Sequence, residues 1–574
     1  EARRVDQGLD GNGHRVNGTV AGPRTRYRGV GGNPWAWAAA AVLPVAFLAA
    51  FFFWPVTALV ARGFVVDGKW SLAGVQEVLA APRTWRILAQ TLTQAVLGTL
   101  GSVVLGVPGA YVLYRCRFPG RRLARAVVSV PFVLPTVVVG VAFAALFAPT
   151  GLFGSLGLQE SLAGIVAALV FFNYSVVVRT VGALWSRLDP RAEDAARTLG
   201  AGRARVLATV TLPALAPAIA SAAALVFLFC ASAFGVVLVL GGQSYGTIET
   251  EIWYQTTQLL DLSAAAALSI LQLLVVGASL MIAGATRARQ ERALRLSGNR
   301  VDAPLRPSDL PAVLVTAAVV LGLLVLPMVS LVWRSFVTAD GIGAANYAAL
   351  SGAAGAFTVS VWQALANSLV IGLAATGLAV GLGLLVSYVL SRRPASAPGR
   401  RVMRTVDAVF MLPLGVSAVT VGFGFLITLN RPPLDLRSSW VLIPIAQAMV
   451  ALPLVVRTLL PTLRAVDPRL HEAAATLGAG PGRVVATIDA PFALRGLGLA
   501  VGFAFATSLG EFGATSFLSR PDRPTLPVVI FQLIGRPGAE NFGMAMAASV
   551  VLAVLTALVM GLAEWIGPKE VHPW

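Results

Sequence analysis

Long apolar runs, separated by short polar segments, constrain this chain more than any other feature of its sequence. Several runs exceed the roughly 20 residues that a helix needs to cross a bilayer. Of the 574 residues, 57% are hydrophobic and only 12% are charged. Backbone amides and carbonyls inside a bilayer must be hydrogen-bonded within the segment, which favours helices. The runs therefore predict an all-α polytopic membrane protein with about twelve transmembrane helices.

Twelve apolar segments are candidate spans, and the loops that join them within each half are mostly short, as packed helices require. They cover residues 35–61, 87–114, 126–148, 162–184, 213–240, 262–285, 310–333, 364–390, 405–429, 439–461, 491–518 and 543–566. Many Gly and Ala residues lie within them, and such small residues let helix backbones approach closely in a bundle.

A polar phrase between two spans occurs twice, at residues 179–213 and, 278 residues later, at 457–491. Of the 35 aligned positions, 17 are identical without a gap. Apolar helices resemble one another because few residue types suit lipid, but a polar loop has no such reason to repeat. The repeat therefore indicates two halves that present the same surface outside the membrane. Six spans in each half predict parallel repeats, related by a pseudo-two-fold axis along the membrane normal.

The repeat also sets the domain boundaries that we expect. The first half covers residues 34–286 with its polar loop at 189–213, and the second covers 310–567 with its loop at 467–491. A cytoplasmic linker at 287–309 joins the halves. The Gly- and Arg-rich tail at 1–33 is expected to be disordered. Both this tail and the C-terminus at 568–574 are expected in the cytoplasm.

The net charge of +18 would suggest nucleic-acid binding in a soluble protein, but the positions of the cations give another reason for it. Of 44 Lys and Arg residues, 34 lie in the tail, the C-terminal end and alternate loops, and 10 lie in the opposite set of loops. Cytoplasmic loops carry an excess of Lys and Arg. The asymmetry predicts a multi-pass protein of the cell (plasma or inner) membrane, with both termini and both polar phrases in the cytoplasm and no nucleic-acid partner.

Each polar phrase predicts a short helix that projects between two spans. Asp189-Pro190 and Asp467-Pro468 are helix-start signals, with the acid as N-cap and Pro at the first helical position. A carboxylate, Asp194 or Glu472, follows near the positive end of the helix, where it is favoured. A narrow apolar face and a glycine turn complete each copy. They are formed by Ala195, Ala196, Leu199 and Gly200 in the first copy, and by Ala473, Ala474, Leu477 and Gly478 in the second.

The two phrases resemble the EAA loop of ATP-binding-cassette (ABC) importer permeases, whose pattern is Glu-Ala-Ala, three residues, Gly, nine residues and Ile-x-Leu-Pro. The second copy matches at Glu472, Ala473, Ala474, Gly478, Ile488 and Pro491, and the first at Ala195, Ala196, Gly200, Leu212 and Pro213, with Asp194 for Glu. In that family the helix of the loop sits in a groove of the nucleotide-binding subunit. The resemblance extends from about residue 85 to 566. It implies an ABC importer type I permease-like fold and two ABC ATPase subunits on the cytoplasmic side, coupled to the spans through these helices.

Segments beyond the fifth span of each half narrow the resemblance. Residues 238–255 and 508–532 are similar to the corresponding parts of thiamine permeases, and somewhat less to those of ferric-iron permeases, which also have two fused halves. The resemblance implies a small, cationic solute such as thiamine or ferric iron. An extracellular or periplasmic solute-binding protein would deliver that solute.

No group of residues in the sequence is suited to bond chemistry. The lysines, Lys69 and Lys569, are followed by Trp and Glu, so neither fits the Gly-Lys-Ser/Thr phosphate-binding loop. The three histidines, among them His471, are scattered, as solvated surface residues would be, and the two cysteines predict no disulfide or metal site. We therefore expect a pore-forming subunit that is no enzyme and binds no cofactor itself, with ATP and Mg on partner subunits.

Ionisable groups at membrane depth are candidate pathway residues, because burying them unpaired is costly. Glu511 lies inside the eleventh predicted span with Ser508 one turn away, and the first half has Ala233 at the equivalent position, beside Ser232. Glu511, Ser508 and Ser232 are therefore candidates for the translocation pathway. A buried carboxylate that only holds the helices together explains Glu511 equally well.

Two segments outside the spans, 241–261 and 519–542, follow the fifth span of each half. They are expected to form short interfacial helices that act as an external gate or contact the binding protein. Their candidate residues are Glu249, Glu251, Trp253, Tyr254, Phe531 and Gln532. Anchoring of the aromatic rings at the lipid headgroups is an alternative role.

A secondary transporter driven by protons or sodium is the alternative from another class, since twelve spans in two parallel repeats suit it as well. Such a transporter would need several midplane ionisable groups, whereas the sequence offers Glu511 alone. A membrane-anchored structural or assembly protein would leave the duplicated polar loop unexplained.

Overall fold

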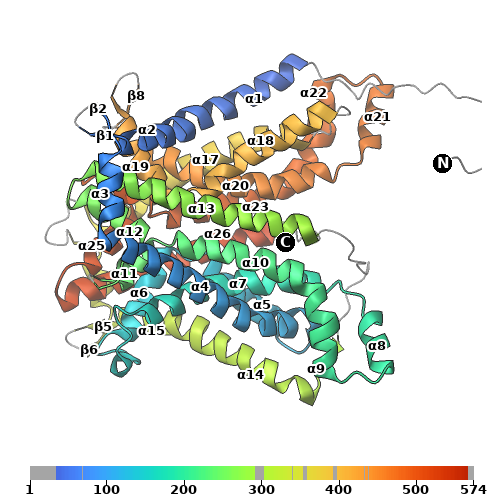
Figure 1. Ribbon diagram of the computed structural model, residues 1–574, viewed down its shortest axis with the longest axis horizontal. Coiled ribbons are helices and arrows are strands. Elements are labelled where there is room, and N and C mark those ends of the chain that lie inside the picture. Colours follow the sequence, from blue (N-terminus) through green and yellow to red (C-terminus); the bar gives the residue numbers. More distant parts are fainter. Residues whose placement is uncertain are drawn as a thin grey trace, which may run out of the picture.

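Helices lie side by side along one direction and make up nearly all of the computed structural model (Figure 1). The structure describes residues 34–66, 69–242, 244–290, 303–338, 341–352, 359–391, 397–431, 434–436 and 439–566. The predicted tail at 1–33, most of the predicted linker and the C-terminus at 568–574 lie outside these residues. The all-α polytopic fold expected from the sequence is confirmed.

The elements of the first half alternate long helices with short connecting ones. The helices are α1 (Pro34–Leu48), α2 (Trp54–Gly63), α3 (Ala73–Ala80), α4 (Pro82–Ala110), α5 (Arg121–Ser129), α6 (Thr136–Phe147), α7 (Leu162–Trp185), α8 (Arg191–Thr198), α9 (Arg203–Val206), α10 (Leu212–Ala231), α11 (Gly235–Leu240), α12 (Ile248–Thr257) and α13 (Leu262–Gln290). Short helices of other types are η1 (Ala49–Phe53), η2 (Tyr111–Arg115), η3 (Val130–Phe132), η4 (Gly154–Leu156) and η5 (Leu207–Thr211). The strands are β1 (Val65–Val66), β2 (Lys69–Trp70) and β3 (Cys116–Arg117).

The second half repeats this order. Its helices are α14 (Leu310–Ala318), α15 (Leu326–Ser335), α16 (Ala345–Ala349), α17 (Val361–Ser391), α18 (Ala397–Gly415), α19 (Ala418–Thr428), α20 (Leu442–Arg464), α21 (Pro468–Thr476), α22 (Pro481–Val484), α23 (Ala490–Gly510), α24 (Thr515–Leu518), α25 (Leu526–Ile534) and α26 (Ala539–Ile566). Other helical segments are η6 (Pro307–Asp309), η7 (Val319–Val325) and η8 (Val485–Asp489). The strands are β4 (Ala303–Pro304), β5 (Val337–Thr338), β6 (Gly341–Ile342), β7 (Asn430–Arg431) and β8 (Leu434–Asp435).

The described residues contain ten helices that are long and apolar enough to cross a membrane, or up to twelve if two bent pairs each count as one span. These helices and pairs fall on the twelve predicted segments. The third and ninth predicted spans, 126–148 and 405–429, are the bent pairs, so each consists of two helices. The axes turn by 103° between residues 121–132 and 136–147, and by 86° between residues 399–413 and 418–428.

Proline explains where the first of these spans breaks. Pro135 has no N–H to continue the helix and adopts an extended conformation, with φ −57° and ψ 137°, so α6 starts afresh at Thr136. In the second pair Pro413 lies near the end of α18, and Ser417 is extended. The Ser417 hydroxyl accepts a hydrogen bond from the amide of Val419 (3.1 Å) and so caps α19.

The fifth span of each half begins and ends earlier in the sequence than predicted, at Arg203–Ala231 and Gly482–Gly510. We expected continuous helices over 213–240 and 491–518, but α10 ends at Ala231 and α23 ends at Gly510. A turn and a short helix, α11 or α24, follow each of them. Apolar composition could not reveal these breaks, because the residues on both sides of each break suit a buried helix.

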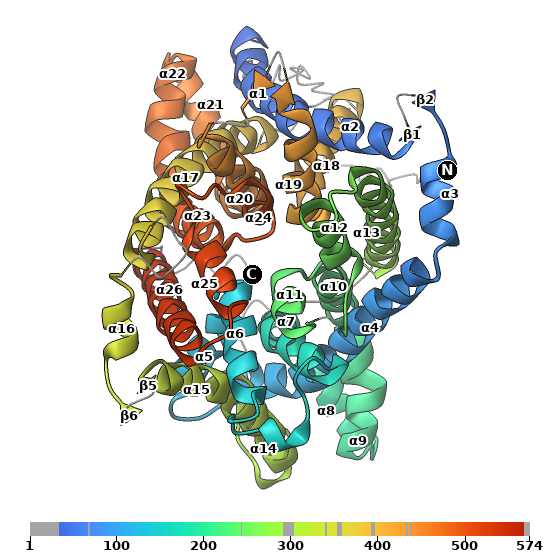
Figure 2. The ribbon, with the colours of Figure 1, turned by 90° about the vertical axis from the view of Figure 1, so that its left-hand side faces the viewer.

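The first span of each half packs mainly against the other half. Helices α1 and α2 lie against α17 and α19, while α14 and α15 lie against α4 and α6 (Figure 2). One apolar cluster accordingly contains fully buried residues of both halves, such as Leu59, Val137 and Phe423. The halves are therefore interlocked and share their core.

The described end of the linker is bound to the first half. Strand β4 pairs in parallel with β3. Asp309 accepts a hydrogen bond from the Tyr111 hydroxyl (3.1 Å) and lies 3.6 Å from the guanidinium of Arg203 at the start of α9. The beginning of the second half is thus fixed beside the polar loop of the first.

We predict that Gly422→Ala destabilises the fold. A Cβ at Gly422 in α19 would lie 2.7 Å from the Cα of Ala514, and backbone cannot move aside as a flexible side chain can. Overpacking of this kind costs about 1–3 kcal/mol, which should lower the melting temperature of the purified protein.

Gly377→Ala in α17 is the matched control. A Cβ there meets nothing within 4 Å, and Ala is the better helix former by roughly 0.5–1 kcal/mol. An equal melting temperature for the two variants would contradict the packing described for α19.

Candidate functional site

The two short helices that the sequence predicted, α8 and α21, lie beyond the spans at the same end of the molecule (Figure 1). α21 begins as expected, with Asp467 as N-cap and Pro468 as its first residue, whereas α8 begins one residue later than expected, at Arg191. The Asp189 carboxylate accepts a hydrogen bond from the amide of Arg191 (3.0 Å), and that of Asp467 accepts one from the amide of Arg469 (2.9 Å). We call this end of the molecule, which carries α8 and α21, the coupling end.

Both helices end in the same left-handed glycine turn. Gly200 has φ +84° and Gly478 has φ +76°, a conformation that favours glycine. The turn leaves Leu199 and Leu477 at the helix ends with 88% and 87% of their surface exposed. The side chains of Leu199 and Leu477, which are equivalent in the repeat, are therefore exposed at the coupling end.

The predicted coupling residues divide between two faces of each helix. Asp194, Ala195, Glu472 and Ala473 are exposed like the two leucines, as are Gly200 and Gly478. Ala196 and Ala474 are only half-exposed, because they lie nearer the side that faces the spans. The outward apolar face of each helix thus consists of one Ala and one Leu, with Leu470 added in α21.

The inward face of each helix is tied to the base of the fifth span at equivalent positions. Glu193 of α8 accepts a hydrogen bond from Thr211 of η5 (2.9 Å), and His471 of α21 lies 2.8 Å from Asp489 of η8. His471, which we expected to be a solvated surface residue, has a side chain only 14% exposed. The sequence analysis missed both contacts, although the common spacing of 18 residues in the two copies was a usable signal.

A cavity of about 380 Å³ lies between the two halves. Both halves contribute to its polar lining, which includes Thr136, Asn173, Ser232, Ser417, Thr507 and Glu511. Two of the three predicted pathway residues, Ser232 and Glu511, therefore border it. Ser508 does not: it is 3% exposed, and its hydroxyl has no hydrogen-bond partner among the described residues.

Glu511 caps the helix that follows it. Its carboxylate accepts hydrogen bonds from the amides of Ala514 (2.7 Å) and Thr515 (3.0 Å), and from the Thr515 hydroxyl. These donors stabilise a carboxylate beside the start of α24. Glu511 therefore stabilises the start of α24, and this role does not depend on whether solute passes it.

An aromatic cluster borders the cavity on the side away from the coupling end. Phe234 and Phe512, equivalent in the repeat, stack on each other with ring centroids 5.5 Å apart. Phe531 of α25 packs on Phe512 (5.3 Å) and on Trp253 of α12 (5.8 Å). The structure thus brings the predicted gate residues Trp253 and Phe531 together, and joins them to the wall of the cavity.

Glu249, which was expected in an external gate or a binding-protein contact, is completely buried and offers no surface for such a contact. Its carboxylate accepts hydrogen bonds from Gln272 of α13 (2.7 Å) and from Ser417 of the second half (2.8 Å). Burial disfavours the charged form and raises the pKa of Glu249 to about 8. Glu249 therefore fastens α12 to the break between α18 and α19.

The other residues of the predicted gate are closer to solvent. Glu251 is 6% exposed but pairs with the exposed Arg83 (2.9 Å), whose guanidinium also lies over the Tyr254 ring. Tyr254 is 41% exposed and Gln532 is exposed as well. Within the described residues, no group of three or more His, Cys, Asp or Glu could hold a metal ion.

The chain is similar in sequence to several known proteins. The family model "binding-protein-dependent transport system inner membrane component" matches residues 98–289. The thiamine transport system permease of Brucella abortus (strain 2308) is 28% identical over 84% of this chain and 87% of its own length, and that of Escherichia coli (strain K12) is 26% identical over 85% and 90%. The sulfate transport system permease of Escherichia coli (strain K12) is 32% identical over 42% of this chain and 86% of its own. A solved bacterial ABC transporter for alginate import is similar with a TM-score of 0.40 and 16% identity, over 46% of this chain and 96% of that one.

We predict that Glu511→Gln lowers the melting temperature of the purified protein. The amide would place an N–H donor where both carboxylate oxygens accept hydrogen bonds, and an unpaired buried donor costs roughly 1–3 kcal/mol. Asp522→Asn removes a carboxylate that is 57% exposed and should leave the melting temperature unchanged.

Uptake per folded molecule separates this structural role from a pathway role. If Glu511→Gln melts like the unmodified protein and yet transports more slowly, Glu511 acts on the solute and the capping role is secondary.

Proposed function

Since this chain belongs to the family of binding-protein-dependent transport system inner membrane components, we propose that its two halves form the whole translocation pathway of an ABC importer. A multi-pass permease subunit of this kind has no bond chemistry of its own. The pathway is assigned to the cavity between the halves, which is lined by equivalent elements of both.

The observation that carries the proposal is the pair of matching helices at the coupling end. Leu199 and Leu477 are almost fully exposed at equivalent positions, and exposed apolar side chains of this kind mark surfaces that a partner covers. Two equivalent docking surfaces suit two copies of one partner. We therefore propose two ABC ATPase subunits, which carry ATP and Mg, as the partners at this end.

The contacts of α8 and α21 suggest how motion reaches the cavity. Glu193 and His471 bind the helices to η5 and η8, which continue into α10 and α23. Those helices end beside the cavity, at Ser232 and Glu511. We call α8 and α21 the docking helices. A displacement of these helices would therefore be transmitted through α10 and α23 to the helix breaks at Ser232 and Glu511, as alternating access requires.

The opposite end is proposed to receive a loaded extracellular or periplasmic binding protein. Tyr254 and Gln532 are exposed there, while Trp253, Phe531 and the stacked Phe234 and Phe512 connect this surface to the cavity wall. Separation of the stacked pair would open the cavity toward the binding protein, and its closure would prevent return of the solute.

Thiamine is the better supported of the two cations that the sequence motifs suggested. Permeases named for thiamine match more than four-fifths of this chain, across both halves. Glu511 borders the cavity and stays a proposed pathway residue for the cationic ring of such a solute. Phe132, Phe229 and Phe503 offer flat apolar surfaces of the kind on which a ring packs.

We expect Ala473→Asp to abolish substrate-stimulated ATP hydrolysis and uptake in the reconstituted complex, while the permease still inserts and folds. Ala473 is exposed on the same face of α21 as Leu470 and Leu477, so the new charge would be buried unpaired under the ATPase. The measurement is ATPase activity per assembled complex, with and without the loaded binding protein.

Ala475→Asp is the matched control, because Ala475 is also exposed on α21 but points to the opposite side of the helix. It should retain most of the activity. Equal activity in the two variants would show that α21 does not dock through the proposed face.

We predict a cytoplasmic coupling end. In intact cells, a membrane-impermeant thiol reagent should label Ser155→Cys, in the exposed loop between α6 and α7, and should not label Thr476→Cys. The two native cysteines are buried and should give little background. Labelling of Thr476→Cys from outside would reverse the topology and remove the ATPase from this end.

A further inference from the structure

The buried carboxyl group of Glu249 lies behind the wall of the central cavity. Glu249 belongs to α12, which is not among the candidate spans of the described residues. It does not border the cavity itself, but its hydrogen-bond partner Ser417 does. Glu249 can therefore affect the pathway only through the residues that it binds.

A chain of hydrogen bonds runs through Glu249 from the first half to the second. The Gln272 amide donates to the Glu249 carboxyl group (2.7 Å) and to the Ala231 carbonyl (3.3 Å), at the end of α10. On the other side, the Ser417 hydroxyl donates to Glu249 (2.8 Å) and accepts from the Val419 amide (3.1 Å), at the start of α19. The carboxyl group thus connects two helix breaks beside the cavity, one from each half.

This network has an acceptor without a donor. The Oε1 atom of Gln272 is buried and has no hydrogen-bond partner among the described residues. An ionised carboxylate cannot serve it, because a carboxylate only accepts hydrogen bonds. A protonated Glu249 carries an O–H donor, and a carboxylic acid can donate to an amide oxygen while it accepts from the amide N–H. The unpaired oxygen therefore indicates that the network holds a proton.

The helices that pack against α12 bring no counter-charge to Glu249. These helices are α4, α13 and α19. Helix α19 contains no ionisable residue, nor does α13 as far as residue 285, and Asp261 before α13 is exposed. Helix α4 begins with the exposed Arg83 and Arg86, and Arg83 binds Glu251, two residues on and so on another face of α12. Among the described residues, no cation pairs with Glu249.

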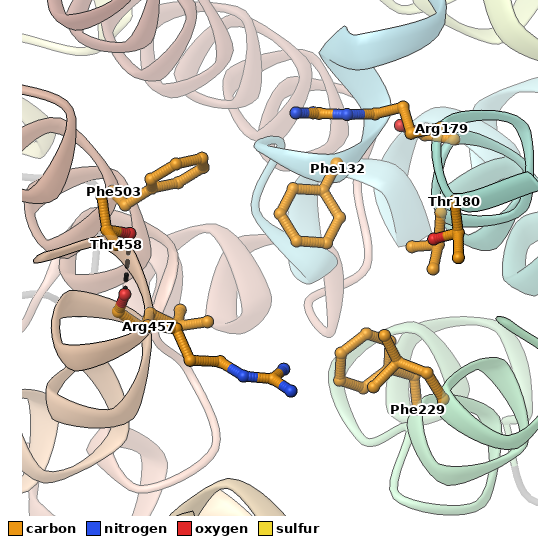
Figure 3. Close-up of a pocket in the computed structure, with 11 residues that line it drawn as sticks. Phe132, Arg179, Thr180, Phe229, Arg457, Thr458 and Phe503 are labelled. Atoms are coloured by element: carbon orange, nitrogen blue, oxygen red, sulfur yellow. Dashed lines mark hydrogen bonds between the residues drawn. The ribbon is translucent and has the colours of Figure 1, made fainter. Parts of the chain in front are cut away.

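Other charged groups beside the pathway do not supply a cation either. Arg179 and Arg457 line a smaller pocket of about 140 Å³ on the side of the coupling end (Figure 3). Helix α12 lies near the opposite end of the molecule (Figure 1). Glu511 borders the cavity, but it is an acid, so its charge would only oppose a second negative charge. Burial is therefore the main influence on the carboxyl group of Glu249, and it raises the pKa of Glu249 to about 8.

We infer that Glu249 is a positioning residue of the transport cycle, which in its protonated form holds the break after Ala231 and the break at Ser417 together behind the cavity. Ionisation would place an unpaired charge between the two halves, and the helices would have to separate or admit water to solvate it. The effect on uptake rests on the proposed transport function, whereas the protonation of Glu249 does not.

Thermal unfolding of the full chain in nanodiscs tests the protonation. Between about pH 5 and pH 8 an unfolded chain releases this proton while the folded chain keeps it. The melting temperature of the unmodified protein should therefore fall, relative to that of Glu249→Gln, until the pH passes about 8. Glu77→Gln removes an exposed carboxylate of α3 and should follow the unmodified protein at every pH. Parallel curves for the unmodified protein and Glu249→Gln would overturn the inference.

Uptake of thiamine by the reconstituted complex tests the positioning role. The rate of the unmodified complex divided by that of Glu249→Gln, each per folded molecule, should fall about tenfold between pH 7 and pH 9. The reason is that the neutral fraction falls by this factor across a pKa of about 8. The ratio cancels the pH dependence of the ATPase and the binding protein, which both complexes share. A ratio that does not change with pH would leave Glu249 as a structural contact without a role in the cycle.

Glu249→Ala tests whether hydrogen bonds carry the effect. Gln has a donor and an acceptor, as the protonated acid has, whereas Ala leaves Gln272 and Ser417 without this partner. At pH 7, uptake per folded molecule should be several-fold faster in Glu249→Gln than in Glu249→Ala, and equal rates would contradict the inference. If Glu249→Ala does not fold, the comparison with Glu249→Gln still decides.

The two measurements separate this inference from the proposed function. If the unmodified complex takes up no thiamine at any pH, the proposed transport of thiamine fails. The melting curves need no ATPase, binding protein or solute, so they still decide whether Glu249 holds a proton.

Discussion

The requirement that backbone polar groups be satisfied inside a bilayer governs where this protein can break its helices. Breaks occur at Pro135, after Ala231, at Ser417 and at Glu511, and all four positions lie at or beside the central cavity. Ser417 and Glu511 supply side-chain acceptors to the amides that the breaks expose. The cavity is therefore lined by irregular backbone, which can exist at membrane depth because protein rather than lipid surrounds it.

Fusion of two halves into one chain lets equivalent positions diverge. Residues 278 positions apart are equivalent in the repeat. Glu511 is equivalent to Ala233, Glu249 to Pro527, and His471 to Glu193. Glu249 accepts a hydrogen bond from Ser417 of the other half. Pro527, its equivalent, has no side-chain oxygen and cannot make this contact. Arg179 and Arg457, by contrast, are the same residue at equivalent positions of the two copies.

Rigid connections join the coupling end to the cavity. The docking helices contact η5 and η8 through one polar pair each, and from there the backbone runs without a break to the cavity. The first span of each half packs against the other half, and the described end of the linker is bound to the first half. The two halves therefore share one apolar core.

Much of this protein could be predicted from residue types and spacing. Apolar length fixed the number of spans, since the bilayer sets how many residues must be apolar. Asp467, Pro468 and Gly478 specify the start and end of a docking helix through local hydrogen bonds and backbone geometry, which need no partner from elsewhere in the chain. The duplicated phrase was visible for the same reason, because its signals are local.

Tertiary structure decided the features that depend on residues far apart in the sequence. The sequence placed Glu511 inside a span and Glu249 outside the spans. The structure shows that Glu249 binds Gln272 and Ser417, while Glu511 caps α24. Packing across the two halves also decided that Ser508 turns away from the cavity and that Arg179 and Arg457 line the same pocket. By itself, the sequence determined a two-fold repeat of spans and docking helices, because these obey periodicity and local capping. Only the fold decided which polar groups share a space, because that depends on how the helices of the two halves come together.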